Sequence, residues 1–137
     1  MRPLAIAAVV AALAACDITN PAPALDLDDL PATVILGLGD QRVVGSSSVR
    51  FSAVREDSRC PVDATCIWAG NARIEVTVSP LAGDGPAQVA TLNSFLEPRT
   101  ASALGLRLSL VGLSPDPRLN RPTSGYRAEL RVEIATE

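Results

Sequence analysis

"YRAELRVEI", residues 126–134, is the stretch of the chain that decides its fold class. Its apolar residues are Tyr126, Ala128, Leu130, Val132 and Ile134, and an arginine or a glutamate stands between each neighbouring two. Successive side chains of a β-strand point to opposite faces, so strict alternation is typical of a strand with one buried and one solvent-facing side. We therefore predict a strand here, with its apolar side toward a core.

The same period of two occurs in SVRFSAV at 48–54, RIEVTVS at 73–79 and LGLRLSL at 104–110. The residues predicted to face the core in these stretches are Val49, Phe51, Ala53, Ile74, Val76, Val78, Leu104, Leu106, Leu108 and Leu110. Segments rich in glycine and proline separate them, notably PLAGDGP at 80–86 and SPDPRLNRPTSG at 114–125. With the shorter apolar segments, we predict seven strands at 33–38, 42–44, 48–56, 72–79, 87–92, 104–113 and 125–135.

Short alternating strands joined by such turns indicate an all-β fold, and no helical period appears after residue 16. We predict an antiparallel β-sandwich of about seven strands, with a small β-barrel as the alternative. The architecture is Ig-like. The chain is not expected to be a true Ig domain, because both downstream cysteines, Cys60 and Cys66, precede the single tryptophan, Trp68, instead of flanking it.

The N-terminus, MRPLAIAAVVAALAAC at 1–16, has one positive charge and an apolar run over 4–13. This run has the length of a secretory signal core and is shorter than the roughly 20 residues of a spanning helix. Leu13-Ala14-Ala15-Cys16 resembles the lipobox of bacterial lipoproteins. The resemblance implies lipid attachment at Cys16 and cleavage before it. An ordinary signal peptide or an unprocessed helix is the alternative.

On this basis we divide the chain into a signal peptide (1–15), a lipid-anchored tether (16–31) and one β-sandwich domain (32–137). The tether carries prolines at 21, 23 and 31 and acids at 26, 28 and 29, which favour an extended chain. Its leucines at 25, 27 and 30 allow the alternative that this part docks as an edge strand.

We expect the protein in the cell envelope, outside the cytoplasm and bound to a membrane through its lipid. Asp17 resembles the signal that retains enteric lipoproteins on the inner membrane, but other bacteria do not all follow this signal. Inner and outer membrane therefore both remain open.

The charge composition excludes several functions. The chain has 12 basic residues, all of them arginine, no histidine and a net charge of −3. Mechanisms that need a catalytic histidine or lysine are thereby excluded, and the commonest zinc ligand is absent. A basic stripe for nucleic acid is also missing. We expect no cofactor and no enzyme activity, and we interpret Glu75, Glu129 and Glu133 as solvated strand residues opposite arginines. A carboxylate-based hydrolase is a further alternative.

The stretch EDSRCPVDATCIWAGN, residues 56–71, holds the remaining two cysteines. With Cys16 assigned to lipid, Cys60 and Cys66 form an even pair in an oxidising compartment, which predicts a disulfide. A metal site could use Glu56, Asp57 and Asp63, but their spacing matches no calcium loop, and two thiolates without histidine make a poor zinc site. A redox pair would be expected as Cys-x-x-Cys rather than Cys-x5-Cys.

The same loop offers candidate binding residues: Asp57, Arg59, Asp63 and Trp68. A disulfide-held turn that carries Arg59 also resembles what a small protease inhibitor presents, so inhibition is the alternative to a protein or glycan partner. We expect Trp68 to pack over the disulfide or to cap the core. Gly70 is expected to let the chain turn into the next strand.

The segments DSRCP at 57–61 and C.WAG at 66–70 resemble a motif of small exported bacterial proteins. Leu113-x-Pro115-x-Pro117 and Tyr126-Arg127-Ala128-x-Leu130 belong to the same resemblance. It implies a shared β fold and a lipoprotein-like or secreted protein, but no activity. The sequence therefore predicts a non-catalytic binding or structural module.

Overall fold

The computed structural model describes residues 22–83 and 85–136, which form eight strands and one short 3-10 helix. The elements are η1 (Leu27–Asp29), β1 (Ala32–Gly37), β2 (Gln41–Val44), β3 (Ser47–Asp57), β4 (Ala72–Pro80), β5 (Gln88–Asn93), β6 (Thr100–Ala103), β7 (Leu106–Ser114) and β8 (Arg127–Ile134). The predicted signal peptide, Cys16 and Asp17 lie outside the described residues. In the described part of the chain, no helix is long and apolar enough to cross a membrane.

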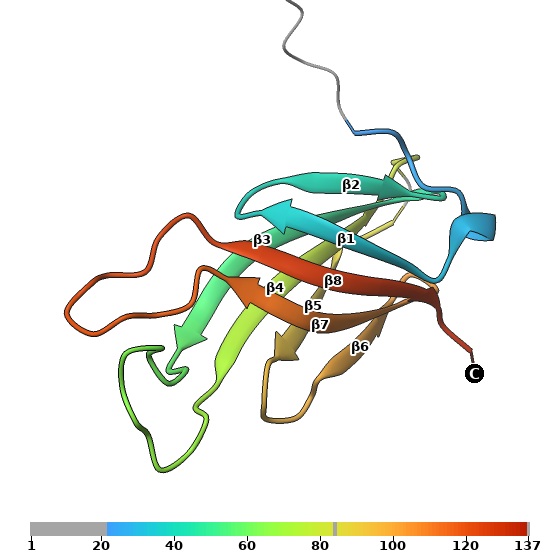
Figure 1. Ribbon diagram of the computed structural model, residues 1–137. Helices are drawn as coiled ribbons and strands as arrows, with labels where there is room; N and C mark the ends of the chain where they lie inside the picture. Colours follow the sequence, from blue (N-terminus) through green and yellow to red (C-terminus); the bar gives the residue numbers. More distant parts are fainter. Residues whose placement is uncertain (1–21, 84, 137) are drawn as a thin grey trace, which may run out of the picture.

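The strands form two antiparallel sheets, which pack face to face (Figure 1). One sheet has the order β1-β8-β7-β6 and the other the order β2-β3-β4-β5. No strand pairing among the described residues joins the two sheets into a closed barrel. The β-sandwich predicted from the sequence is thus confirmed.

The alternating stretch that indicated the fold forms β8. Ala128, Leu130 and Val132 are fully buried between the sheets, as predicted. Tyr126 comes just before the strand and is partly buried against the core. Ile134 is 53% exposed, so the prediction that it is buried is wrong at this last position of the strand.

The structure has one strand more than predicted, β6 at Thr100–Ala103, and the strand expected at 104–113 begins only at Leu106. Leu104 and Gly105 have positive φ angles of 49° and 76° and form a two-residue turn between the paired residues Ala103 and Leu106. Two positive φ angles are typical of tight hairpins. The strand before the turn, β6, has the sequence TASA, in which only the small side chains of Ala101 and Ala103 face the core, so its apolar pattern is short and weak.

Two irregularities in β3 change which side chains face the core. The register shifts between Phe51 and Ala53, so Ser52 is an extra residue and Ala53 lies opposite Glu75 on the outer face. The predicted inward position of Ala53 is therefore wrong, and Val54 packs against the core instead. A second shift follows Val54 and restores the phase, so that Asp57 lies opposite the fully buried Ala72.

The segment before β1 is docked on the domain from Leu25 onward. Leu25 forms a parallel bridge to Val44, and its carbonyl accepts a hydrogen bond from the Gly45 amide at 2.8 Å. Leu30 packs against the core. Residues 25–30 are therefore docked on the domain, through one bridge and the 3-10 helix and not as the edge strand that the leucines suggested.

Three loops meet at the opposite end of the sandwich. They span residues 58–71 after β3, 94–99 after β5 and 115–126 after β7 (Figure 1). The 11 residues of β3 separate this end from the docking position of Leu25. At about 3.3 Å per residue, the separation is roughly 30 Å.

Candidate functional site

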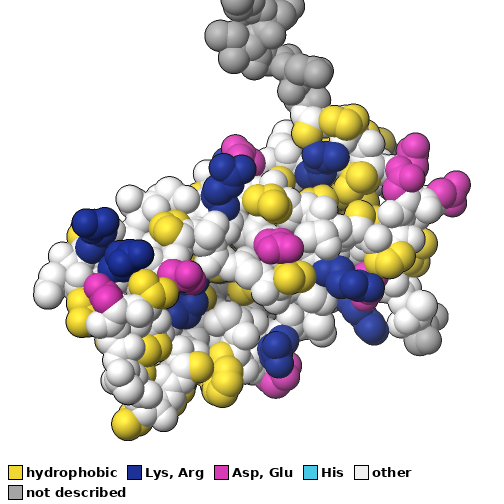
Figure 2. Space-filling view, in the orientation of Figure 1, with side chains coloured by type: hydrophobic (Ala, Val, Ile, Leu, Met, Phe, Trp, Pro, Cys, Tyr) yellow, Lys and Arg dark blue, Asp and Glu magenta, His cyan; other side chains and the backbone are white. Residues whose placement is uncertain are grey.

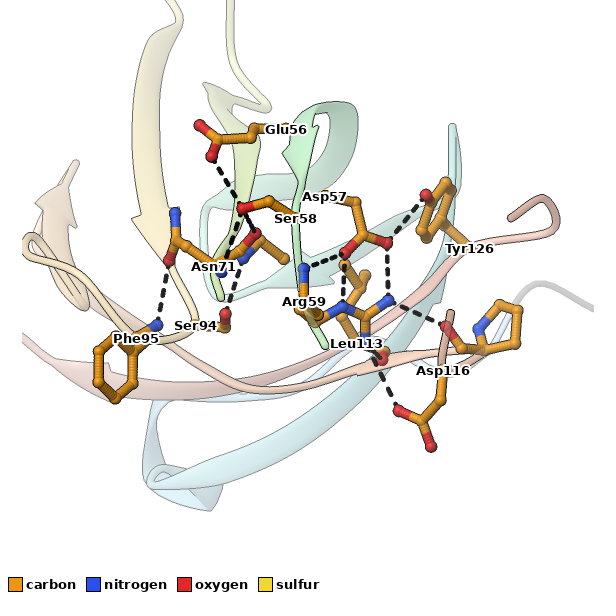
Figure 3. A network of polar contacts seen from close by, with 12 residues as sticks. Glu56, Asp57, Ser58, Arg59, Asn71, Ser94, Phe95, Leu113, Asp116 and Tyr126 are labelled. Carbon is orange, nitrogen blue, oxygen red and sulfur yellow. Dashed lines mark hydrogen bonds and ion pairs between the residues drawn. The ribbon is translucent and has the colours of Figure 1, made fainter. Parts of the chain in front are cut away.

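The centre of this end is an ion pair between two residues of the DSRCP segment. The Arg59 Nε donates to Asp57 Oδ1 at 2.7 Å, and Arg59 Nη2 donates to Asp57 Oδ2 at 2.8 Å (Figure 3). The side chains of Arg59 and Asp57 are only 14% and 8% exposed. Two parallel charge-assisted hydrogen bonds hold both side chains in one geometry.

The Arg59 guanidinium also reaches the other sheet. Its Nη1 donates to the Leu113 carbonyl, and its Nη2 donates to the Pro115 carbonyl at 2.9 Å. On the far side of the pair, the Tyr126 hydroxyl donates to Asp57 Oδ2 at 3.0 Å. We call this set, Asp57, Arg59, Tyr126 and the carbonyls of Leu113 and Pro115, the latch. It ties the loop after β3 to the loop before β8 (Figure 3).

The latch changes the acidity of the groups that form it. Burial of the Asp57 carboxyl opposes its ionisation, but the hydrogen bonds and charge of Arg59, helped by the Tyr126 hydroxyl, outweigh burial and hold the pKa of Asp57 below its ordinary value. Burial and the neighbouring Asp57 carboxylate raise the pKa of Tyr126. Asp57 is therefore an ionised, fully engaged carboxylate at neutral pH.

Further contacts hold the loop after β3 in place. The Val62 amide donates to the Pro117 carbonyl at 3.0 Å, and Asp63 Oδ1 accepts a hydrogen bond from the Leu119 amide at 2.8 Å. Cys60 and Cys66 form the predicted disulfide, with Cα atoms 5.9 Å apart. Closing so short a loop stabilises the fold by roughly 2.4 kcal/mol in the chain-entropy treatment.

Gly70 is required where the loop returns to β4. Its φ angle is +73°, and a Cβ atom added there would lie 1.8 Å from the Ser58 carbonyl oxygen. Next to it, the Asn71 carbonyl accepts hydrogen bonds from the Ser58 amide at 2.7 Å and the Ser58 hydroxyl at 3.0 Å. The prediction that Gly70 lets the chain turn into this strand is confirmed, and the close approach explains why a side chain does not fit.

Two buried asparagines attach the third loop, and the sequence analysis did not single them out. Asn71 Nδ2 donates to Asn93 Oδ1 at 2.9 Å, and Asn71 Oδ1 accepts from the amides of Phe95 and Leu96. Asn93 Nδ2 donates to the Pro98 carbonyl at 3.1 Å. The available signal was the position of each asparagine, at the boundary between a predicted strand and a loop. Both amides are satisfied, so they serve the architecture of the loops.

Large apolar side chains are exposed on all three loops. We call this set the loop surface: Val62 (54% exposed), Ile67 (105%), Trp68 (53%), Phe95 (55%), Leu96 (46%) and Leu119 (50%). Figure 2 shows separate apolar side chains over the loop after β3, and arginines at the tip of the loop before β8. Trp68 does not cap the core, because half of its surface is exposed and it is not packed against the buried cluster, and its packing over the disulfide stays a prediction.

The structure thus separates the four candidate binding residues. Asp57 and Arg59 belong to the latch, Asp63 holds a backbone amide, and only Trp68 lies on the loop surface. Among the described residues, no group of three or more His, Cys, Asp or Glu side chains is placed to hold a metal ion.

The glutamates that were expected opposite arginines follow this expectation in part. Glu75 forms an ion pair with Arg55 at 2.8 Å, and Glu133 forms one with Arg131, two residues before it in β8, at 2.7 Å.

Comparison of the chain with known protein families, with curated proteins and with solved structures finds no match.

Proposed function

We propose that the protein is a non-catalytic lipoprotein of the bacterial cell envelope, anchored through Cys16, whose domain binds a partner through the loop surface. The observation that carries this proposal is the exposure of six large apolar side chains on three loops that are held by the latch, the disulfide and the two asparagines. Several large apolar side chains exposed at one end of a domain favour an interaction role for that end. Loops that are already ordered lose less conformational entropy on binding.

The chemistry of the loop surface favours a protein partner over a glycan. Isoleucine, leucine, valine and phenylalanine offer no hydrogen bonds to sugar hydroxyls, whereas aromatic and aliphatic anchors in a desolvated centre dominate protein interfaces. The segment that leads toward Cys16 docks at the other end of β3. A membrane anchor there would leave the loop surface uncovered.

The position of Arg59 does not favour protease inhibition. An inhibitor that acts through arginine must project the side chain into the enzyme's pocket, and Arg59 is 14% exposed with its guanidinium bound to Asp57 and two carbonyls. The hydrolase alternative gains no support from Asp57 either. Its carboxylate accepts hydrogen bonds from Arg59 and Tyr126, an arrangement that stabilises the loops and keeps its pKa low.

Contact through the loop surface is tested by photo-crosslinking in living cells. A benzophenone amino acid at Ile67, which is fully exposed, is expected to give a discrete cross-linked adduct with one envelope protein. The control position is Val89 on β5, which is 60% exposed and lies near the other end of the sandwich. An adduct at 67 that disappears with Trp68→Ser, and none at 89, supports the proposal. Equal labelling at both positions, or none at either, refutes it.

The lipid anchor has its own test. Cells fed radioactive palmitate are expected to label the protein, and Cys16→Ala is expected to abolish this labelling because it removes the sulfur that accepts the lipid. Cys60→Ser is the control that keeps the label. Labelling that persists in Cys16→Ala, or a mature protein that retains residues 1–15, would contradict the anchor while leaving the role of the loop surface open to the cross-linking test.

A further inference from the structure

A polar hollow lies on the outer face of β2, β3 and β4, at a distance from the three loops. Its volume is about 440 Å³. Six polar residues line it: Gln41, Ser48, Arg50, Ser52, Thr77 and Ser79. One positive charge is surrounded by hydroxyl and amide groups, and no carboxylate lines the hollow.

Arg50 differs from the other arginines that β3 and β4 expose. Arg55 pairs with Glu75 at 2.8 Å and Arg73 with Glu56 at 3.7 Å. Arg50 instead stands between Gln41 of β2 and Thr77 of β4 in the strand register. Within the described residues, no carboxylate oxygen lies within 4.0 Å of its guanidinium. Its five donors remain available to a ligand.

The neighbours of Arg50 also present donors to the hollow. The Ser48 hydroxyl donates to Gln41 Oε1 at 3.3 Å, which occupies the acceptor of this amide and leaves its NH₂ group free to donate. The Ser52 hydroxyl donates to the Arg50 carbonyl at 3.3 Å and also contacts the Thr77 hydroxyl. The Ser79 hydroxyl makes no side-chain hydrogen bond with the residues that the structure describes, so it is a further donor.

The alternation of the strands explains why these groups converge. Ser48, Arg50 and Ser52 are alternate residues of β3 and share its outer face. On β4, Thr77 lies opposite Arg50 and Ser79 lies opposite Ser48. The hollow therefore lies on the sheet and not in a loop.

We propose that this hollow is a binding site for the carboxylate of an acidic saccharide. The planar guanidinium of Arg50 matches a carboxylate in a bidentate pair, and Gln41 Nε2 and Ser79 Oγ add donors beside it. The hydroxyls of Ser48, Ser52 and Thr77 are suited to exchange hydrogen bonds with sugar hydroxyls. This site is separate from the loop surface, so neither proposal depends on the other.

Calorimetric titration of the full chain in neutral detergent tests the site with a short oligogalacturonate. We expect saturable binding that Arg50→Gln weakens at least tenfold and Ser79→Ala weakens a few-fold. The methyl-esterified oligosaccharide, which keeps the sugar but lacks the charge, is expected not to bind. Arg107→Gln, on the exposed face of β7, is the matched control and should bind like the unchanged protein. Circular dichroism confirms that each variant is folded.

No binding at millimolar oligogalacturonate, equal binding by Arg50→Gln, or equal binding of the methyl ester would overturn the site. A titration with inorganic phosphate tests whether the hollow selects the saccharide or binds any oxyanion. If phosphate binds as tightly as the oligogalacturonate and with the same dependence on Arg50, the saccharide is overturned as the ligand and a simple oxyanion site takes its place.

Discussion

Gly70→Ala is expected to lower the free energy of unfolding by about 3 to 4 kcal/mol. Two costs add at this position. Gly70 has a φ angle of +73°, which an L-residue with a side chain adopts only with strain, and the new Cβ atom would meet the Ser58 carbonyl oxygen at 1.8 Å. Because the obstacle is backbone and not a flexible side chain, the loop must move away from β4, and the Ser58 hydrogen bonds to Asn71 break.

Urea denaturation followed by circular dichroism measures this loss. Gly105→Ala is the matched control: its φ angle is +76°, but an added Cβ meets nothing within 4 Å. This control isolates the conformational cost, about 1 kcal/mol. If the two variants lose the same stability, the close approach of Ser58 to Gly70 contributes nothing and our account of this turn is wrong.

Asp57→Ala is expected to cost about 3 to 5 kcal/mol, because it leaves the largely buried guanidinium of Arg59 without its carboxylate. The exposed pair between Arg55 and Glu75 is the matched control. It has the same 2.8 Å contact, but its side chains are 58% and 23% exposed, so Glu75→Ala should change stability little. A similar small effect for both variants would show that the latch does not stabilise the fold.

The pH dependence of unfolding checks the same pair through its ionisation. The folded protein lowers the pKa of Asp57, so this carboxylate contributes stability at pH values above the ordinary aspartate pKa, about 3.9. The contribution is lost as the pH falls through the lower pKa of the folded state. Asp57→Asn is therefore expected to lose less stability than the unchanged protein between about pH 4 and the acid limit of folding. Parallel curves would mean that Asp57 is not held ionised by the latch.

The wrong inward position of Ala53 has a clear physical cause. Period-two alternation assumes that each strand is regular, and the assumption holds for Ala128, Leu130 and Val132 in β8. Ala53 was assigned wrongly because an extra residue in β3 changed the phase of the alternation. Leu104 packs against the core as predicted, but it lies in a two-residue turn and not in a strand. Such changes depend on how a strand pairs with its neighbours, which a single stretch of sequence does not show.

The candidate site was recognised as unusual, but its role was interpreted in the opposite sense. Asp57 and Arg59 were expected on a binding loop, and they hold the loop from inside. Their partners lie far along the chain: the Leu113 and Pro115 carbonyls are 54 and 56 residues from Arg59, and Tyr126 is 69 residues from Asp57. The Leu113 and Pro115 carbonyls that accept hydrogen bonds from Arg59 belong to the backbone, and the sequence does not single them out because every residue has a carbonyl.

The sequence by itself determined the all-β class, the burial of the β8 face and the pairing of Cys60 with Cys66, because alternation and cysteine count are local or arithmetic properties of the chain. Only the tertiary structure decided which side of the loop after β3 faces solvent. Closure of the sandwich places Asp57 and Arg59 against the other sheet, where burial and long-range hydrogen bonds engage them, and leaves Ile67 and Trp68 exposed. Which residues are free to bind a partner follows from this packing, since a charged side chain near the core is retained there by its partners.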